Sequence, residues 1–209
     1  MNDTASKRWL GPAQLTALGF LALILTGTAL LSMPFASADG APTALVSALF
    51  TATSATTLTG LVTEDTGSHW SLAGQLIVLA LIQVGGLGIM SITSLTGMLL
   101  TGRVKLRSRY STAAEGRPIL DGGVRRTLVA TLLLTFFFEG AVSVILGIRF
   151  ATVYGMAPGR AAYEGVFHAI SGFNNAGFGL RSDSLVSYNT DGWILIPLAG
   201  ALMIGGLGY

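Results

Sequence analysis

The chain has 209 residues, of which 51% are hydrophobic and 11% are charged, whereas about a quarter of the residues of an average soluble domain are charged. These proportions exclude a water-exposed globule. Apolar segments recur along the whole length, which also excludes a polar protein behind one secretory signal, so we predict an all-α integral membrane protein. The absence of cysteine excludes disulfide frameworks, thiolate metal sites and a cysteine nucleophile.

Four apolar segments are predicted, in chain order, to form membrane-spanning helices. Residues 12–33 carry no charge and form the first span. Residues 71–100 form the second, and because thirty uncharged residues exceed one upright crossing, we expect tilt, a kink or a cytoplasmic extension. Residues 127–148 form the third, with Glu139 as their only charge, and residues 193–209 begin a fourth.

Two shorter apolar segments do not fit as spans. Residues 43–55 and 161–173 each hold 13 residues, so as helices they would measure about 20 Å. Each precedes a short polar string, residues 56–60 and 174–177. We therefore predict the order helix, re-entrant half-helix, returning strand, helix.

The two halves of the chain repeat one another. Four residues recur 117 positions later: Phe50, Ala52, Ser54 and Gly60 as Phe167, Ala169, Ser171 and Gly177. The string VGGLG at residues 84–88 recurs as IGGLG 120 positions later. The predicted division is a cytoplasmic N-terminus (1–11), a first repeat (12–101), a basic cytoplasmic loop (102–126) and a second repeat (127–209) with a truncated last helix.

Charge placement predicts the orientation. The N-terminus and the basic loop hold nine Lys and Arg against three Asp and Glu, whereas the opposite loops hold three against six. By the positive-inside rule the basic side, with the N-terminus, is cytoplasmic. The acidic loops on the other side would mildly attract cations. The basic cluster from Arg103 to Arg109 is either this topology signal alone, a lipid-headgroup patch or a regulatory contact.

Both repeats enter and leave on the cytoplasmic side, so a rotation about the membrane normal relates them, which is the geometry of a central pore. Each half-helix then directs the negative end of its dipole to mid-membrane. The returning strings expose backbone carbonyls, hard ligands that suit a dehydrated alkali cation, and glycine adopts the positive φ that such a string needs. We predict that the carbonyls of two groups bind the ion: Thr57, Leu58, Thr59 and Gly60, and Asn175, Ala176, Gly177 and Phe178. Thr56 and Asn174 are predicted to support them from behind.

These strings resemble a known family. The segments FTATSATTLTGLVTEDTG, GQLIVLALIQVGGLGIM, FHAISGFNNAGF and GGLGY are similar to the Trk/Ktr/HKT potassium transporters. Because only 11 residues precede the first span, the chain resembles the N-terminal half of a KtrB-type membrane subunit. The resemblance implies potassium uptake across the plasma membrane, with sodium as a second candidate ion, through four membrane-pore-membrane repeats around one filter. It also implies a homodimer and a cytosolic ring of nucleotide-binding regulatory subunits, with no cofactor on this chain.

The chain departs from the family pattern in three places. Leu58 stands where valine is usual, a mild change because the carbonyl faces the ion. Asn174 and Asn175 have no counterpart in the first repeat. With two of the four implied repeats, the chain lacks the family's gating loop in the third and its pore-proximal arginine in the fourth. We therefore expect a fragment of a longer subunit, with a pore formed by paired chains as the alternative.

Several features have a purely structural interpretation beside the functional one. Glu139 is a candidate for the ion pathway or a structural carboxylate, and in either case we expect it to face the protein interior. The GGLG strings are expected to be helix-packing positions, not ligands. His168 and Ser171 share a helix face, as in an intramembrane serine hydrolase, but the first repeat has Thr51 in place of the histidine. A purely structural or receptor-like membrane protein would not need polar strings at membrane depth.

Overall fold

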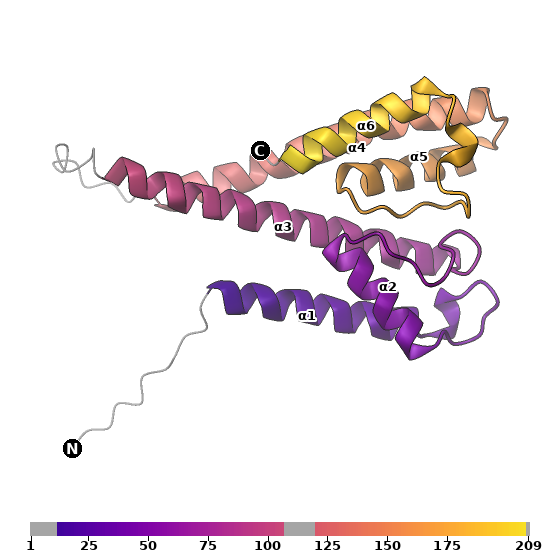
Figure 1. Ribbon diagram of the computed structural model, residues 1–209, viewed down its shortest axis with the longest axis horizontal. Coiled ribbons are helices and arrows are strands. Elements are labelled where there is room, and N and C mark those ends of the chain that lie inside the picture. Colours follow the sequence, from indigo (N-terminus) through magenta and orange to yellow (C-terminus); the bar gives the residue numbers. More distant parts are fainter. Residues whose placement is uncertain (1–11, 107–119, 208–209) are drawn as a thin grey trace, which may run out of the picture.

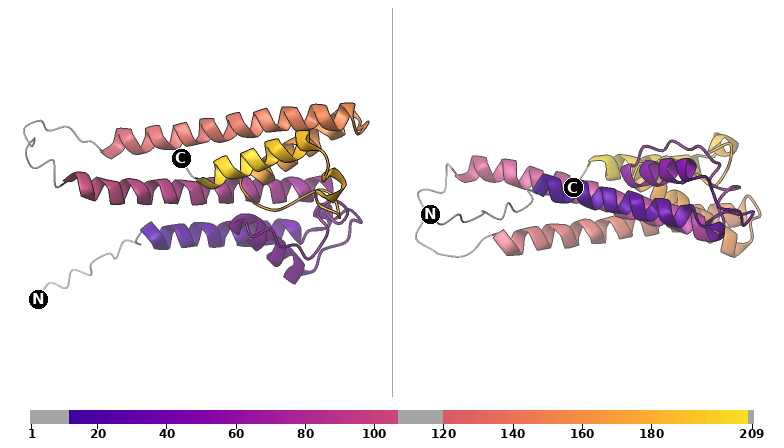
Figure 2. Two further views of the ribbon diagram at one scale, coloured as in Figure 1. Left: turned by 45° about the horizontal axis from the view of Figure 1, so that its top comes forward. Right: turned by 90° about the horizontal axis from the view of Figure 1, so that it is seen from below.

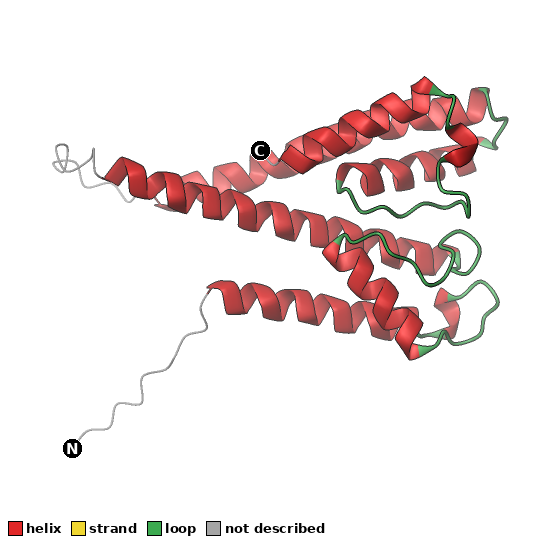
Figure 3. Cartoon of the chain, in the orientation of Figure 1, coloured by secondary structure: helices red, strands yellow, loops and turns green. Residues whose placement is uncertain are grey.

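The computed structural model describes residues 12–106 and 120–207. All regular structure in these two ranges is helical. The strand-like pairing within them is limited to an isolated β-bridge between Ser37 and Trp70. The order of elements is α1 (Pro12–Leu31), the short 3-10 helix η1 (Pro34–Ala36), α2 (Leu45–Thr57), α3 (Leu72–Leu106), α4 (Leu120–Thr152), α5 (Pro158–Phe173), the 3-10 helix η3 (Val186–Tyr188) and α6 (Gly192–Leu207) (Figures 1 and 3).

The long helices form where the sequence has uncharged runs, because hydrocarbon offers the backbone no other hydrogen-bond partners. Three windows are long and apolar enough to cross a membrane: Gln14–Leu31 in α1, Leu72–Ile89 in α3 and Val129–Thr152 in α4. The fourth expected span forms α6, an apolar helix of 16 residues that is shorter than these three. Leu133 and Phe137 of α4 are 67% and 66% exposed, as suits a lipid-facing surface.

The three long helices run alongside one another, and the short helices lie at one end of the molecule (Figures 1 and 2). The start of α1, the end of α3 and the start of α4 lie toward the opposite end. α2 packs on α1 and α3, whereas α5 packs on α4 and α6 and also contacts α3. Each half of the chain thus places its second helix, α2 or α5, in contact with the helices before and after it.

The two halves share a core. A first cluster of buried apolar side chains surrounds α2 and includes Trp70, but it also takes in Phe167 and Phe178 from the second half. A second cluster surrounds α5 and includes Phe150 and Ile194. Because residues of the second half complete the first cluster, the ends of the two short helices are held in a fixed relation.

Two helix boundaries differ from the sequence expectation. α2 continues through Thr57, so Thr56 and Thr57 are helical and the string begins only at Leu58. The Thr57 hydroxyl donates to the carbonyl of Thr53 at 2.7 Å, which satisfies it within the helix. α5 begins at Pro158, three residues before the expected start, because proline is pre-organised for the first helical position.

The basic loop and the returning strands also differ from expectation. α3 continues to Leu106 and α4 begins at Leu120, so both edges of the expected loop at 102–126 are helical. α3 is one helix of 35 residues, about 52 Å long, which is longer than one upright membrane crossing, as expected from the thirty uncharged residues. Both strings are irregular backbone and not strands. Lys7, Arg8 and residues 107–117 of the basic region lie outside the described residues.

Candidate cation site

The first string begins with a left-handed turn. Leu58 has φ 58° and ψ 35°, and its N–H donates to the carbonyl of Ser54, so the turn closes α2. The next N–H, of Thr59, donates to the same carbonyl at 3.0 Å. The Thr59 hydroxyl donates to the Ser54 hydroxyl at 2.9 Å, and Gly60 follows with φ 73°. The string is thereby folded back over the last turn of its own helix.

The second string has the same construction. Asn174 caps α5, Asn175 has φ 54°, and Gly177 has φ 75°. The N–H of Ala176 donates to the carbonyl of Ser171 at 2.8 Å, as Thr59 does to Ser54. The Ser171 hydroxyl donates to the carbonyl of Phe178 at 2.6 Å, which fixes the far end of the string.

The positive φ angles occur at equivalent positions of the two strings. Leu58 corresponds to Asn175 and Gly60 to Gly177, both at the repeat offset of 117 residues. The two glycines also touch. A Cβ on Gly177 would lie 3.0 Å from the Cα of Gly60, and a Cβ on Gly60 would lie 2.8 Å from the carbonyl oxygen of Ala176. The strings therefore lie against each other, and neither glycine has room for a side chain.

The string carbonyls differ from the helical carbonyls in their hydrogen bonding. Among the described residues, no hydrogen bond is assigned to the carbonyl oxygens of Leu58, Thr59, Gly60, Asn175, Ala176 or Gly177. Inside a membrane, carbonyls of this kind are tolerated where they line protein or a water-filled cavity. Thr59, Asn175 and Gly177 are moreover exposed, so the two strings offer adjacent oxygens that a cation could reach.

Glu139 lies behind the second string and not against lipid. It is 4% exposed, and the side-chain amide of Asn174 donates to it at 3.1 Å. Gln83 of α3 donates to its other oxygen at 3.3 Å. Nothing in the sequence singled out Gln83, which is one uncharged polar residue in a long apolar run. The contact joins residues 56 positions apart, so only the tertiary structure reveals it.

The GGLG glycines pack against the ends of the short helices. A Cβ on Gly85 would lie 2.1 Å from the carbonyl oxygen of Thr56, and one on Gly205 would lie 1.8 Å from that of Phe173. These two carbonyls belong to the last turns of α2 and α5. The first glycine of each motif therefore lets its helix pack closely against the end of the short helix that precedes a string, as expected of a packing position.

The geometry does not support a serine hydrolase. Ser171 donates its hydroxyl proton to the carbonyl of Phe178. The Nδ1 atom of His168 is 2.8 Å from the carbonyl of Glu164, and no hydrogen bond joins the histidine to the serine in the described part of the chain. Without a base in contact, the serine hydroxyl is a brace for the string.

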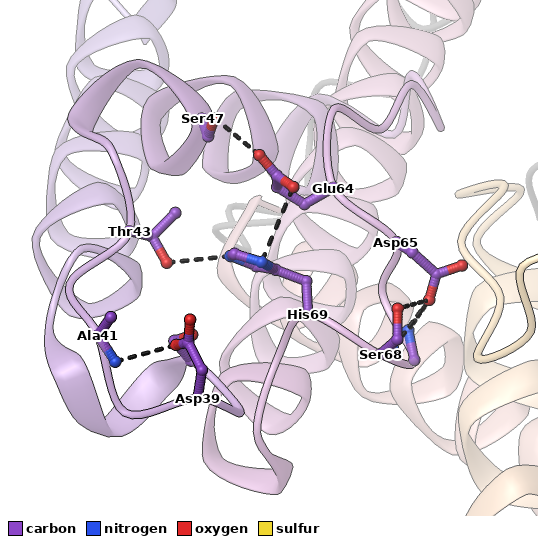
Figure 4. A network of polar contacts seen from close by, with 10 residues as sticks. Asp39, Ala41, Thr43, Ser47, Glu64, Asp65, Ser68 and His69 are labelled. Atoms are coloured by element: carbon purple, nitrogen blue, oxygen red, sulfur yellow. Dashed lines mark hydrogen bonds and ion pairs between the residues drawn. The ribbon is translucent and has the colours of Figure 1, made fainter.

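Polar side chains hold the loops beside the short helix α2 in the first half of the chain (Figure 4). The Ser47 hydroxyl donates to Glu64 at 3.2 Å, and the other oxygen of Glu64 lies 3.7 Å from Nδ1 of His69. The Nε2 atom of His69 is 3.1 Å from the hydroxyl of Thr43. The loop that follows the first string is thus tied to the start of α2.

An ion pair joins the end of α4 to the loop before α6 in the second half of the chain. Arg149, near the end of α4, donates to Asp191 at 2.8 Å, and the side chain of Asp191 is 6% exposed. The Arg149 hydrogen bond holds the pKa of Asp191 below its ordinary value, with a further contribution from the Tyr154 hydroxyl. Asp191 also accepts from the N–H of Trp193 at 3.0 Å, which links this ion pair to the first turn of α6.

The sequence matches the TrkH family, described as cation transport protein, over residues 13–209. The chain belongs to this family. Family membership confirms the resemblance drawn from the string motifs, and it favours transport over the hydrolase alternative.

Similar proteins are about twice as long as this TrkH-family chain. Potassium/sodium uptake protein NtpJ of Enterococcus hirae is 36% identical over 209 residues, which cover 100% of the chain and 46% of that protein. Ktr system potassium uptake protein B of Bacillus subtilis is 38% identical over 198 residues, covering 95% of the chain and 44% of the relative. The protein of the same name from Vibrio alginolyticus is 35% identical, covering 95% and 43%. The chain spans about half the length of the curated relatives it matches.

Proposed function

We propose that the chain supplies two strings of the potassium-selective filter of a Ktr-type uptake transporter in the plasma membrane. The observation that carries this proposal is the pairing of the strings: equivalent left-handed turns, touching glycines, and carbonyls that no donor occupies. Backbone oxygens in this arrangement replace the hydration shell of an alkali cation. Potassium is the proposed cargo, and the name of the Enterococcus relative favours sodium as a second ion.

The short helices favour the same cation. α2 and α5 both end where a string begins, so the negative ends of their dipoles point at the strings. With the charge asymmetry of the loops, we infer that the strings open toward the acidic, outer side and that the N-terminus is cytoplasmic. A cation arriving from the acidic side would then meet the strings first.

Two strings do not surround an ion. We propose that further strings complete the filter, either from a continuation of the polypeptide or from a second chain, and that the subunit forms a homodimer. The basic region between α3 and α4 is the proposed contact for a cytosolic, nucleotide-binding regulatory subunit. This follows the resemblance to Ktr systems and the net positive charge of that region.

The test replaces one glycine of each string. Gly60→Ser and Gly177→Ser in the complete gene product should raise sodium uptake relative to potassium, because a Cβ at positive φ costs roughly 1–2 kcal/mol and meets the other string. Gly200→Ser is the control, since a Cβ on Gly200 meets nothing within 4 Å. The measurement is the potassium-to-sodium ratio of isotope uptake into liposomes, normalised to folded protein. An unchanged ratio in both string variants would place the filter elsewhere.

A further inference from the structure

A polar clamp joins three helices at the point where the second string begins. We define it as Gln83 of α3, Glu139 of α4 and Asn174 at the end of α5. The Asn174 amide donates to Glu139 at 3.1 Å, to Gln83 at 3.3 Å and to the carbonyl of Ile170 at 2.9 Å. Gln83 in turn donates to the second oxygen of Glu139 at 3.3 Å. Glu139 and Asn174 are 4% and 3% exposed.

The oxygen of the Asn174 amide has no hydrogen-bond partner among the described residues, but it lies against the backbone of α3. Gly86 lies one turn after Gln83 on α3, and a Cβ on Gly86 would come within 1.9 Å of this oxygen. α3 therefore contacts the same asparagine in two ways: through the hydrogen-bonding side chain of Gln83 and through its backbone at Gly86. These two contacts leave Asn174 one position, set by a helix of the other repeat.

The first string has no such clamp. Thr57, the repeat equivalent of Asn174, bonds within its own helix. Met203, which corresponds to Gln83, is 64% exposed. A Cβ on Gly206, the equivalent of Gly86, meets nothing within 4 Å. Within the described residues Met203 and Gly206 have no string to hold, and this attachment to a neighbouring repeat is seen at the second string alone.

The clamp requires a carboxylate at its centre. Two amide groups direct N–H donors at Glu139, one at each oxygen, and a carboxylate alone accepts on both. A glutamine at 139 would leave two NH₂ groups facing each other. A buried charge in a membrane helix is costly, and within the described residues no cation pairs with this one. The hydrogen bonds that Glu139 accepts from Gln83 and Asn174 are the interactions that offset this cost.

We propose that Gln83 and Glu139 are positioning residues that set the ion selectivity of the second string by fixing Asn174. This inference rests on the proposed filter. Asn174 precedes Asn175, whose left-handed turn aims the carbonyls up to Gly177, so release of Asn174 changes the direction of that turn. The side chains of the clamp do not need to touch the ion.

The test exchanges the carboxylate and the amide. Glu139→Gln and Gln83→Glu alone each break the donor and acceptor pattern, whereas the double variant restores it with the roles reversed. We expect each single variant to lower the potassium-to-sodium uptake ratio about tenfold, the effect of losing one hydrogen bond to a charged group, or about 1.4 kcal/mol. The double variant should return most of the ratio, which a merely structural role would not do.

Gln75→Met is the matched control. Gln75 lies on the same face of α3, two turns earlier, and accepts the hydroxyl of Tyr163 of α5 at 2.8 Å. It links the same two repeats away from the string, so its variant should keep the ratio. All variants are measured in the complete gene product and normalised to folded protein by gel filtration. If Glu139→Gln or Gln83→Glu does not fold, the uptake ratio of Gln83→Met tests the clamp instead, because this substitution removes the hydrogen bonds of Gln83 at almost constant volume.

The outcomes separate the clamp from the filter. A lowered ratio in the single variants with recovery in the double variant supports the clamp. Normal ratios in the single variants, no recovery in the double variant, or an equal loss in Gln75→Met overturns it. If Gly177→Ser lowers the ratio in the same assay, the filter proposal survives such a failure. If Gly177→Ser has no effect either, both proposals fail.

Discussion

The two GGLG motifs allow a test with neighbouring glycines. Gly205 and Gly206 are adjacent on α6, but a Cβ on Gly205 would lie 1.8 Å from the carbonyl oxygen of Phe173, whereas a Cβ on Gly206 meets nothing within 4 Å. Real Cβ contacts essentially never fall below 3.0 Å, so Gly205→Ala requires the helices to separate. The obstacle is backbone at the end of α5 and not a flexible side chain.

The expected cost is at the upper end of the usual range for overpacking, about 3 kcal/mol. Gly206→Ala has no such contact and removes a flexible residue from a helix, which stabilises a helix by up to about 1 kcal/mol. In the first repeat, Gly85→Ala should be as harmful as Gly205→Ala. Gly88→Ala should be mild, because its Cβ would meet only the ring of Phe20 at 3.4 Å.

The assay is the melting temperature and monodisperse yield of each variant in detergent, with the wild type alongside. Gly205→Ala and Gly85→Ala should lose yield and melt lower, while Gly206→Ala and Gly88→Ala should not. If Gly206→Ala and Gly205→Ala were equally damaging, the motif would act through general helix flexibility. The assigned contact with the ends of the short helices would then be wrong.

Four further outcomes are expected. Ser171→Ala should destabilise the protein by roughly 1–3 kcal/mol, because the buried carbonyl of Phe178 loses its donor; a wild-type melting temperature would contradict this. Glu139→Leu should reduce folded yield more than Glu139→Gln, and equal yields would refute a buried clamp. Asp191→Asn should melt below wild type at pH 6. The pKa of Asp191 in the folded protein lies below the ordinary 3.8, so its ionised carboxylate stabilises the fold above pH 3.8 and this stabilisation is lost as the pH falls below that value. In a pH series, the difference in melting temperature between wild type and Asp191→Asn should therefore narrow below pH 3.8. Finally, a polypeptide ending at Tyr209 should not by itself rescue a strain deficient in potassium uptake, because two strings do not close a ring.

Much of the fold follows from hydropathy, since a bilayer fixes how long an uncharged helix must be. The sequence predicts the three long spans and the two short helices, with most helix ends within about four residues, whereas α3 ends six residues later and α4 begins seven residues earlier than expected. The end of α2 was misplaced because threonine at 56 and 57 suggested a string, whereas the hydroxyl of Thr57 bonds back into the helix. Hydropathy carries no information about such a local bond.

The candidate site was predictable where residue type limits the backbone. Gly60 and Gly177 were identified because glycine permits positive φ, and asparagine at 175 also tolerates it. Leu58 gives no such signal, because its left-handed φ is imposed by the turn that closes α2. The repeated motif predicts a packing role for Gly85 and Gly205. It does not predict that each glycine contacts the end of a short helix. That contact depends on how helices distant in sequence meet.

The unbroken length of α3 has a mechanical consequence. In its first half this helix carries Gln83 and Gly86, which contact Asn174, and its last turn includes Arg103 and Lys105. A continuous helix is stiff along its axis, so a small shift or twist applied at the basic end arrives at the asparagine seat with little loss. The residues that hold Asn174 and the basic residues Arg103 and Lys105 are thus parts of one stiff element.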